Sequence, residues 1–152
     1  MSLPSTAIGT GLPPVTMTVE RGRLQLFAQA IGERDPLYTD LAAARKAGHP
    51  DLPVPLTFLF GIELQQPYPF AYLTDLGVDM RRVLHGEQTF TYHSTAHAGD
   101  TLTARPVIVD VRSKNGGALD LLTKDTTVTR ADGSRVCDLR TLTVVRNEVA
   151  AR

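Results

Sequence analysis

Four runs rich in Thr and Val dominate the second half of the chain, and they constrain its fold more than any other feature. They are separated by turn-forming segments, of which Asp132-Gly133 is the strongest hairpin signal. Because β-branched residues favour strands, we expect four consecutive antiparallel strands. Pro106 lies inside the second run and predicts an edge position or a bulge there. The predicted strands cover residues 87–93, 101–112, 118–130 and 134–146.

Helix-forming segments precede these strands. Val15, Met17 and Val19 alternate with Thr, which predicts one short early strand. The apolar segment LTFLFGIEL at 56–64 predicts a buried helix interrupted by Gly61. Helices followed by consecutive strands indicate an α+β fold with helix on one face of the sheet. Apolar residues at helical spacing predict a helix over 20–31. Asp40 and Gly48 bound a second helix over 39–47, and a short helix is expected near 70–76.

Composition narrows the class of protein. Hydrophobic residues make up 42% and charged residues 21%, which is typical of a globular domain. Lys and Arg number 16, as do Asp and Glu, so the basic excess of a nucleic-acid binder is missing. A single cysteine, Cys137, allows no internal disulfide, and no apolar run predicts a signal peptide or membrane span. We expect a cytoplasmic protein that binds neither nucleic acid nor membrane.

The domain organisation is simple. Residues 1–14 are rich in Gly, Pro, Ser and Thr and predict a flexible lead-in. Residues 15–146 predict one domain, and 147–152 a C-terminal tail. A long antiparallel sheet leaves edges that pairing across a two-fold axis would cover, so we expect a dimer.

Two segments carry a resemblance to a known family. The first runs from Phe27 to Asp40 and is followed by Ala43; the second comprises 84–93 and 98–102. Together and in this order they resemble the MaoC-like dehydratase family, in its N-terminal MaoC-like or FAS1-like branch. The resemblance implies a hotdog fold, a twisted antiparallel sheet wrapped around a central apolar helix. It also implies action on enoyl or 3-hydroxyacyl thioesters. No cofactor or metal is implied; coenzyme A or an acyl carrier would be part of the substrate.

The resemblance places the catalytic segment but not its usual residues. Where the family has Asp, Asn and His, this chain has Glu33, Asp35 and Tyr38. Tyr has an ordinary pKa near 10 and is a poor proton acceptor at neutral pH, whereas His, near 6.5, is a good one. The frame of the loop is kept by Gly32, Pro36 and Asp40.

Three functions follow from this resemblance. The first is an acyl-chain-binding subunit, paired with a catalytic MaoC-like subunit that supplies the Asp and the His. The second is a self-sufficient homodimeric hydratase using Glu33 or Asp35. The third is an acyl-CoA binder or thioesterase on the same fold, because fold does not fix function.

The candidate residues also have structural interpretations. Without the resemblance, Glu33 and Asp35 would be helix caps and Tyr38 a half-buried aromatic residue. His93 and His97 are four apart in a strand-to-turn region, where they do not predict a metal site. Five residues are expected to line the substrate pocket, and each also has a structural interpretation in the core or at a turn. They are Pro55, Thr57, Phe58, His85 and Gly86.

Overall fold

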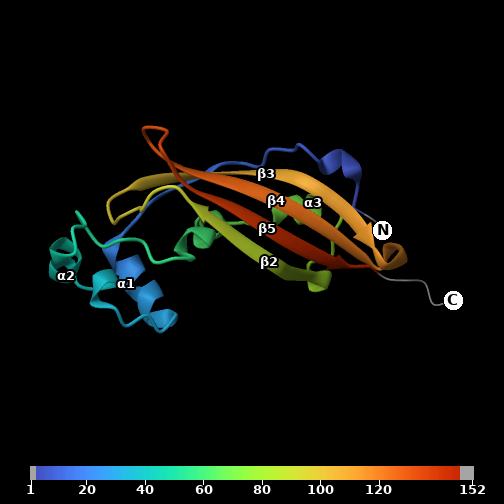
Figure 1. Cartoon of the computed structure of the whole chain (residues 1–152). Coiled ribbons are helices and arrows are strands. Elements are labelled where there is room, and N and C mark those ends of the chain that lie inside the picture. The colour runs from blue at the N-terminus through green and yellow to red at the C-terminus, as the bar shows by residue number, and fades with distance from the viewer. Residues whose placement is uncertain (1–2, 148–152) are drawn as a thin grey trace.

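The computed structural model describes residues 3–147, which form one five-stranded antiparallel sheet with helices at one end and on one face (Figure 1). The spatial order of the strands is β1-β3-β4-β5-β2. All four predicted strands of the second half are confirmed. The short early strand is β1 (Val15–Thr18), and the four strands of the second half are β2 (Val83–Tyr92), β3 (Thr101–Lys114), β4 (Leu119–Arg130) and β5 (Arg135–Arg146).

Alternation of side chains gives the sheet a buried inner face and a more polar outer face. In β4 the inner face takes the even-numbered residues from Asp120 to Val128. In β5 it takes the odd-numbered residues from Cys137 to Val145. Polar side chains on the inner face include Lys124 and Thr141, which lie opposite each other in the register. This face is therefore buried without being wholly apolar.

Gly133 and Pro106 are two positions at which the sequence predicts a turn or an irregularity of the sheet. Gly133, between β4 and β5, has a φ of 84°, a conformation that glycine adopts without strain. Pro106 lies in β3 beyond the part that pairs with β1. Its carbonyl accepts from the N–H of Leu12 (2.9 Å), so the missing N–H of the proline points to the sheet edge. β3 itself lies between β1 and β4, so Pro106 is not on an edge strand; beyond β1 this side of β3 is bonded to the N-terminal segment.

The predicted helices near the N-terminus are present at one end of the sheet (Figure 1). They are α1 (Arg21–Ala30), the 3₁₀ turn η2 (Pro36–Tyr38) and α2 (Leu41–Lys46). Phe27, Leu37 and Leu41 from this group pack against the main core cluster, which also includes the fully buried Leu24. The group is thus fixed to the sheet by apolar contacts.

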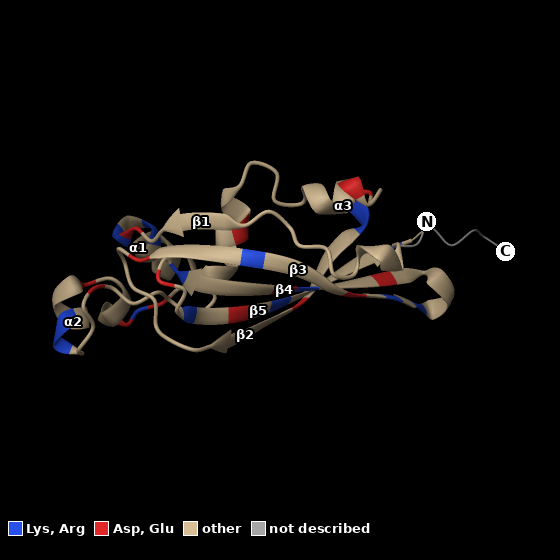
Figure 2. Ribbon diagram, turned by 90° about the horizontal axis from the view of Figure 1, so that it is seen from above, with Lys and Arg blue, Asp and Glu red and all other residues tan. Residues whose placement is uncertain are grey.

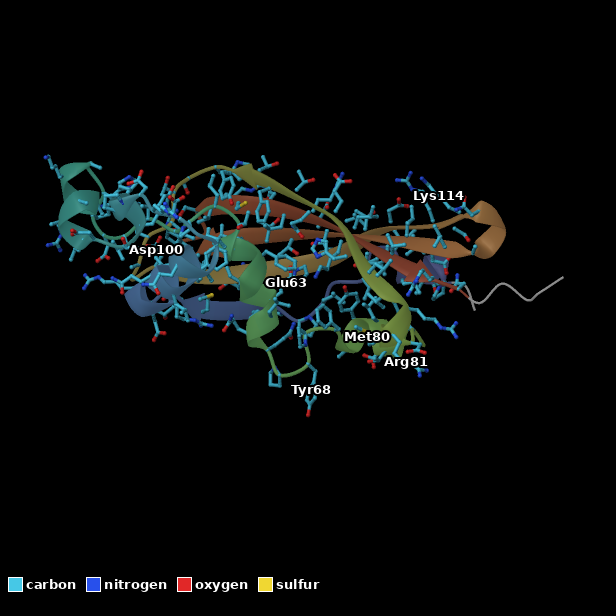
Figure 3. The ribbon with its side chains drawn as sticks, turned by 90° about the horizontal axis from the view of Figure 1, so that it is seen from below. Glu63, Tyr68, Met80, Arg81, Asp100 and Lys114 are labelled. Carbon is cyan, nitrogen blue, oxygen red and sulfur yellow. The ribbon has the colours of Figure 1, made fainter. Side chains whose placement is uncertain are left out.

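The central helix differs from the expected one. It is the 3₁₀ helix η3 (Phe58–Gln65) rather than an α-helix, and it crosses the inner face of the sheet (Figure 3). Prolines at 53, 55, 67 and 69 leave room for only a short element, and 3₁₀ geometry is used for short pieces. The core expectation is confirmed, since Phe58, Leu59 and Ile62 are buried.

Shorter helical elements complete the structure. The α-helix α3 (Ala71–Asp75), predicted over 70–76, and the turn η4 (Met80–Arg82) lead into β2. Two further 3₁₀ turns are η1 (Ser5–Ala7) and η5 (Asn115–Gly117). No helix among residues 3–147 is long and apolar enough to cross a membrane. Lys and Arg are intermixed with Asp and Glu along the molecule (Figure 2).

Residues before β1, expected to form a flexible lead-in, contact the sheet. Leu3 and Ala7 are buried in a second apolar cluster with Leu73 of α3. The N–H of Gly9 donates to the carbonyl of Ile108 (2.8 Å), so this segment covers the β3 edge beyond β1. The predicted tail lies outside the described residues from position 148 onward.

Candidate functional site

The loop between α1 and α2 carries the three candidate catalytic residues. It begins at Gly32, whose φ of 73° turns the chain out of α1. The N–H of Glu33 donates to the carbonyl of Ala28 (2.9 Å), which closes the end of the helix. The predicted loop frame is therefore present.

The acidic side chains of this loop bind its own backbone. One oxygen of the Glu33 carboxylate accepts from the N–H groups of Arg34 (2.8 Å) and Asp35 (2.9 Å). Asp35 accepts from the N–H of Leu37 (2.9 Å) and caps η2. Asp40 accepts from the N–H of Ala42 (2.7 Å) and caps α2. The capping interpretation is confirmed for Asp35, and all three carboxylates hold the shape of the loop.

Thr57 lies beside Tyr92, at the end of β2. The hydroxyl oxygen of Tyr92 accepts from the N–H of Thr57 (3.1 Å), the residue just before η3. Burial raises the pKa of Tyr92, and the proximity of Cys137 and Tyr38 adds to the rise. The sequence gives no signal for Tyr92. The Tyr92 hydroxyl thus links the end of β2 to the residue that precedes the central helix.

A cavity of about 280 Å³ lies between the central helix, α3, η4 and the strands β2, β4 and β5. Its walls are mostly apolar. Several of the lining side chains are exposed at its rim, including Leu64, Phe70, Met80 and Leu84. Such a concave site with few polar groups is typical of a small-molecule pocket. A larger hollow of about 590 Å³ on the outer face has Asp110, Arg112 and Arg140 in its lining, and these side chains form ion pairs. It is more open and more polar than the first cavity.

Buried polar groups form one side of the cavity. The carboxylate of Glu63, on η3, forms an ion pair with the ammonium of Lys124, on β4. Its other oxygen accepts from the hydroxyl of Thr126 (2.6 Å). The ammonium also lies 5.3 Å from the ring centroid of Tyr72. Burial raises the pKa of Tyr72 to about 12, although a hydrogen bond with Thr143 acts in the opposite direction. The floor of the cavity is therefore polar.

Sequence reasoning missed Glu63 and Lys124. Glu63 is the only charged residue in the apolar segment 56–64. Lys124 is one of the even-numbered residues of β4, which face the interior. A charged residue at a position patterned for burial is a signal that could have found both.

The residues expected at the substrate pocket occupy different places. His85 lines the cavity, with its ring centroid 5.1 Å from that of Phe60. Pro55 is buried, and Phe58 packs edge-to-face on Phe27 with centroids 5.3 Å apart, in the main core. Their role toward a substrate stays a prediction.

Gly86 sits at a bulge in β2, where the pairing with β5 shifts between His85 and Glu87. A Cβ atom there would lie 2.9 Å from Cγ2 of Val144 and 3.2 Å from the carbonyl oxygen of Leu142. We expect Gly86→Ala to lower the free energy of unfolding by about 1–3 kcal/mol, because the backbone of β5 cannot retreat freely. Urea unfolding measures this change.

Gly61→Ala is the matched control for this substitution. A Cβ atom at Gly61 meets nothing within 4 Å, so the same chemical change adds no clash. Equal stability of the two variants would show that β5 yields to the added methyl group.

His93 and His97, the two histidines four positions apart, have different partners in the structure. His93 binds Asp138 (Nε2 to Oδ2, 2.7 Å), whereas His97 contacts His49 (3.0 Å between ring nitrogens). No group of three or more metal-ligating side chains occurs in the described part of the chain.

The histidine pair predicts a pH dependence of stability. Burial lowers the pKa of His97 from its ordinary 6.5, as do His49 and Arg130, against the opposing carboxylates Asp100 and Asp51. Just below pH 6.5 the unfolded chain therefore binds more protons than the folded protein. The contribution of neutral His97 to folding stability is complete above that pH and is lost as the pH falls. We expect the melting temperature to drop less between pH 7 and pH 5 in His97→Asn than in the wild type.

His85→Asn serves as the control, because His85 is exposed and has no histidine neighbour among the described contacts. Parallel pH profiles for wild type and His97→Asn would contradict the assignment.

Comparison with known proteins agrees with this architecture. A family model described as the FAS1-like dehydratase domain region matches residues 6–139. A UPF0336 protein of Streptomyces coelicolor is 38% identical over 117 residues, which is 76% of this chain and 78% of that protein. A UPF0336 protein of Saccharopolyspora erythraea is 34% identical over 147 residues, which is 96% of this chain and 93% of that protein.

Solved structures show the same fold. The C-terminally truncated HadBC complex, a 3R-hydroxyacyl-ACP dehydratase from Mycobacterium tuberculosis, matches with a TM-score of 0.77 and 26% identity over 91% of this chain and 96% of that chain. A MaoC-like dehydratase matches with a TM-score of 0.80 and 26% identity over 93% of this chain and 42% of that chain. These matches confirm the α+β hotdog fold that the two sequence segments predict.

Proposed function

Since the chain belongs to the FAS1-like dehydratase family, we propose that it is the acyl-chain-binding subunit of a heteromeric enoyl-thioester hydratase or 3-hydroxyacyl-thioester dehydratase. Its catalytic partner would be a MaoC-like subunit that supplies the Asp and the His. The thioester of coenzyme A or of an acyl carrier would be the substrate, without a further cofactor. We place the complex in the cytoplasm. Residues 15–146 would form the single domain of this chain.

The observation that carries this proposal is the altered loop between α1 and α2. Hydration needs a base that takes a proton from water, and Tyr38 stands where the family has its His. Glu33 and Asp35 accept hydrogen bonds from the loop backbone. The loop keeps the shape of a catalytic segment while its strongest proton acceptor is replaced by a phenol.

The sheet edge supports a partner subunit. Within residues 3–147, β2 pairs only with β5, so its other edge offers free backbone donors and acceptors. Leu84 on β2 and Met80 just before it are exposed beside that edge and also line the cavity. A subunit that pairs with β2 would cover these side chains and the mouth of the cavity together. HadBC, to which this chain is similar, is itself a complex.

Glu33 favours a second candidate, a self-sufficient homodimeric hydratase. Its carboxylate occupies the place of the family's Asp and is oriented by two backbone N–H groups. A preorganised carboxylate of this kind could activate water. An acyl-CoA binder or thioesterase is a third candidate, which the apolar cavity alone would also suit.

One experiment separates these candidates. The chain is purified alone and together with a MaoC-like subunit from the same genome that retains the Asp and the His. Hydration of a short and a long enoyl-CoA is followed as loss of the enoyl absorbance. We expect no turnover by the chain alone, and turnover only when both proteins are present. Glu33→Gln should leave the activity of the complex unchanged.

Controls test the route of assembly. Leu84→Asp, on the free edge of β2, should abolish the complex and its activity, because it places a charge in an apolar contact. Ile8→Asp is the matched control, since Ile8 is similarly exposed (45% against 47%) but lies near the β3 edge. Turnover by the chain alone that disappears in Glu33→Gln would replace the first candidate with the second.

A further inference from the structure

The polar floor of the cavity points to its ligand. We propose that this cavity selects acyl groups that carry an uncharged oxygen, an oxo or hydroxyl group, on the part of the chain away from the thioester. The inference rests on the proposed function, because it names the class of acyl chain that the same cavity would take.

The cavity changes character from rim to floor. Its rim is made by exposed apolar side chains such as Phe70 and Leu84, whereas Glu63 and Lys124 are 8% and 7% exposed. Figure 3 shows Glu63 on the central helix against the sheet, and Met80 at the start of η4. A chain that enters between the apolar walls therefore ends among buried charges rather than in further hydrocarbon.

Lys124 has hydrogen-bonding capacity to spare. An ammonium carries three N–H donors. Among residues 3–147, its hydrogen-bond acceptor is Glu63, and its other polar contact is the face of the Tyr72 ring. Thr141, across the register from Lys124, donates its hydroxyl to the side chain of Gln88 (2.8 Å). An oxygen atom on a bound chain would give the ammonium an acceptor that the protein itself does not supply.

A wholly hydrocarbon chain would do the opposite. It would displace water from the ammonium and offer no acceptor, and a desolvated donor left without a partner is costly. The cavity thus discriminates against an unsubstituted chain that reaches its floor.

The charge of the floor favours a neutral oxygen. Glu63 neutralises Lys124, and Thr126 completes the hydrogen bonding of the carboxylate. A carboxylate at the end of the acyl chain would give up its hydration for a site with no net positive charge. The volume, about 280 Å³, is near the lower end of the range for ligand pockets, which suits an acyl chain of modest length.

A matched set of thioesters tests this inference. Binding of octanoyl-CoA, 7-oxooctanoyl-CoA and the corresponding ω-carboxylate, suberyl-CoA, is measured by calorimetry. The titrations use residues 1–152 and their complex with the catalytic subunit. We expect the oxo compound to bind about tenfold more tightly than octanoyl-CoA, because its oxygen accepts from a charged donor. Suberyl-CoA should bind more weakly than the oxo compound.

A double variant provides the control. Glu63→Leu with Lys124→Met removes both charges at similar volume, a change that buried ion pairs often tolerate. Its melting temperature checks that it folds, and its preference for the oxo compound should disappear. The comparison of ligands on the wild type does not depend on this variant.

The outcomes separate the two proposals. Equal binding of the oxo compound and octanoyl-CoA, or a preference for octanoyl-CoA or suberyl-CoA, overturns the inference and leaves acyl binding intact. A preference for the oxo compound that survives in the double variant also overturns it, since the floor would not be the cause. Failure of every thioester to bind, to the chain or to the complex, overturns the proposed function as well.

Discussion

Replacing Lys124 by methionine is expected to lower the free energy of unfolding by about 3–5 kcal/mol, because it leaves the Glu63 carboxylate buried without its cation. Methionine fills much the same volume, so the loss comes from the charge rather than from a cavity. Thr126 would still donate to the carboxylate, but one neutral hydroxyl does not replace an ammonium. Urea unfolding, followed by circular dichroism, measures the difference.

Two controls define the cause of this effect. Glu63→Leu combined with Lys124→Met should recover most of the lost stability, because neither charge is then left unpaired. Lys114→Met, on the exposed end of β3, should change stability by no more than about 0.5 kcal/mol. If Lys124→Met is as stable as the double variant, the Glu63 carboxylate has another source of stabilisation in the folded protein.

Leu59→Ala is the second substitution with a large expected effect. Leu59 lies on the central helix, is 1% exposed, and belongs to the main core cluster with residues from the sheet and from α1. Removing its side chain costs the transfer free energy and leaves a cavity, so we expect a loss of about 2–5 kcal/mol. Thermal and urea unfolding both report this loss.

Leu64→Ala makes the same chemical change on the same helix at a residue that is 42% exposed. We expect its stability to stay within about 0.5 kcal/mol of the wild type, since little apolar surface leaves the core. Because Leu64 lines the cavity, acyl-CoA binding should weaken in this variant. Similar losses of stability in both variants would mean that the helix does not divide into a core side and a cavity side.

Local signals in the sequence predict much of the fold. Asp132-Gly133 marks the turn between β4 and β5, and the alternation of Thr and Val identifies the long strands. The cap formed by Asp40 and the turn at Gly32 follow from backbone requirements of a few neighbouring residues. Such features depend on short stretches of chain, so a sequence pattern is sufficient to find them.

Features that depend on distant residues could not be predicted in the same way. Glu63 and Lys124 are 61 positions apart and meet only because the central helix crosses β4. β2 begins at Val83 rather than at the predicted Glu87. The bulge at Gly86 shifts the pairing with β5, and the strand continues on both sides of that shift. The candidate site followed the same rule: the loop was found through its local motif, whereas the cavity required the tertiary structure.

The free edge of β2 limits the concentration at which this protein can accumulate in a cell without aggregating. A strand with unpaired backbone groups is a template for any other strand, so molecules made in excess of the proposed partner would associate with one another. Folding stability would also rise with the concentration of the partner by mass action. In the proposed complex, matched synthesis of the two subunits would therefore limit aggregation, because surplus copies would be the first to aggregate or be degraded.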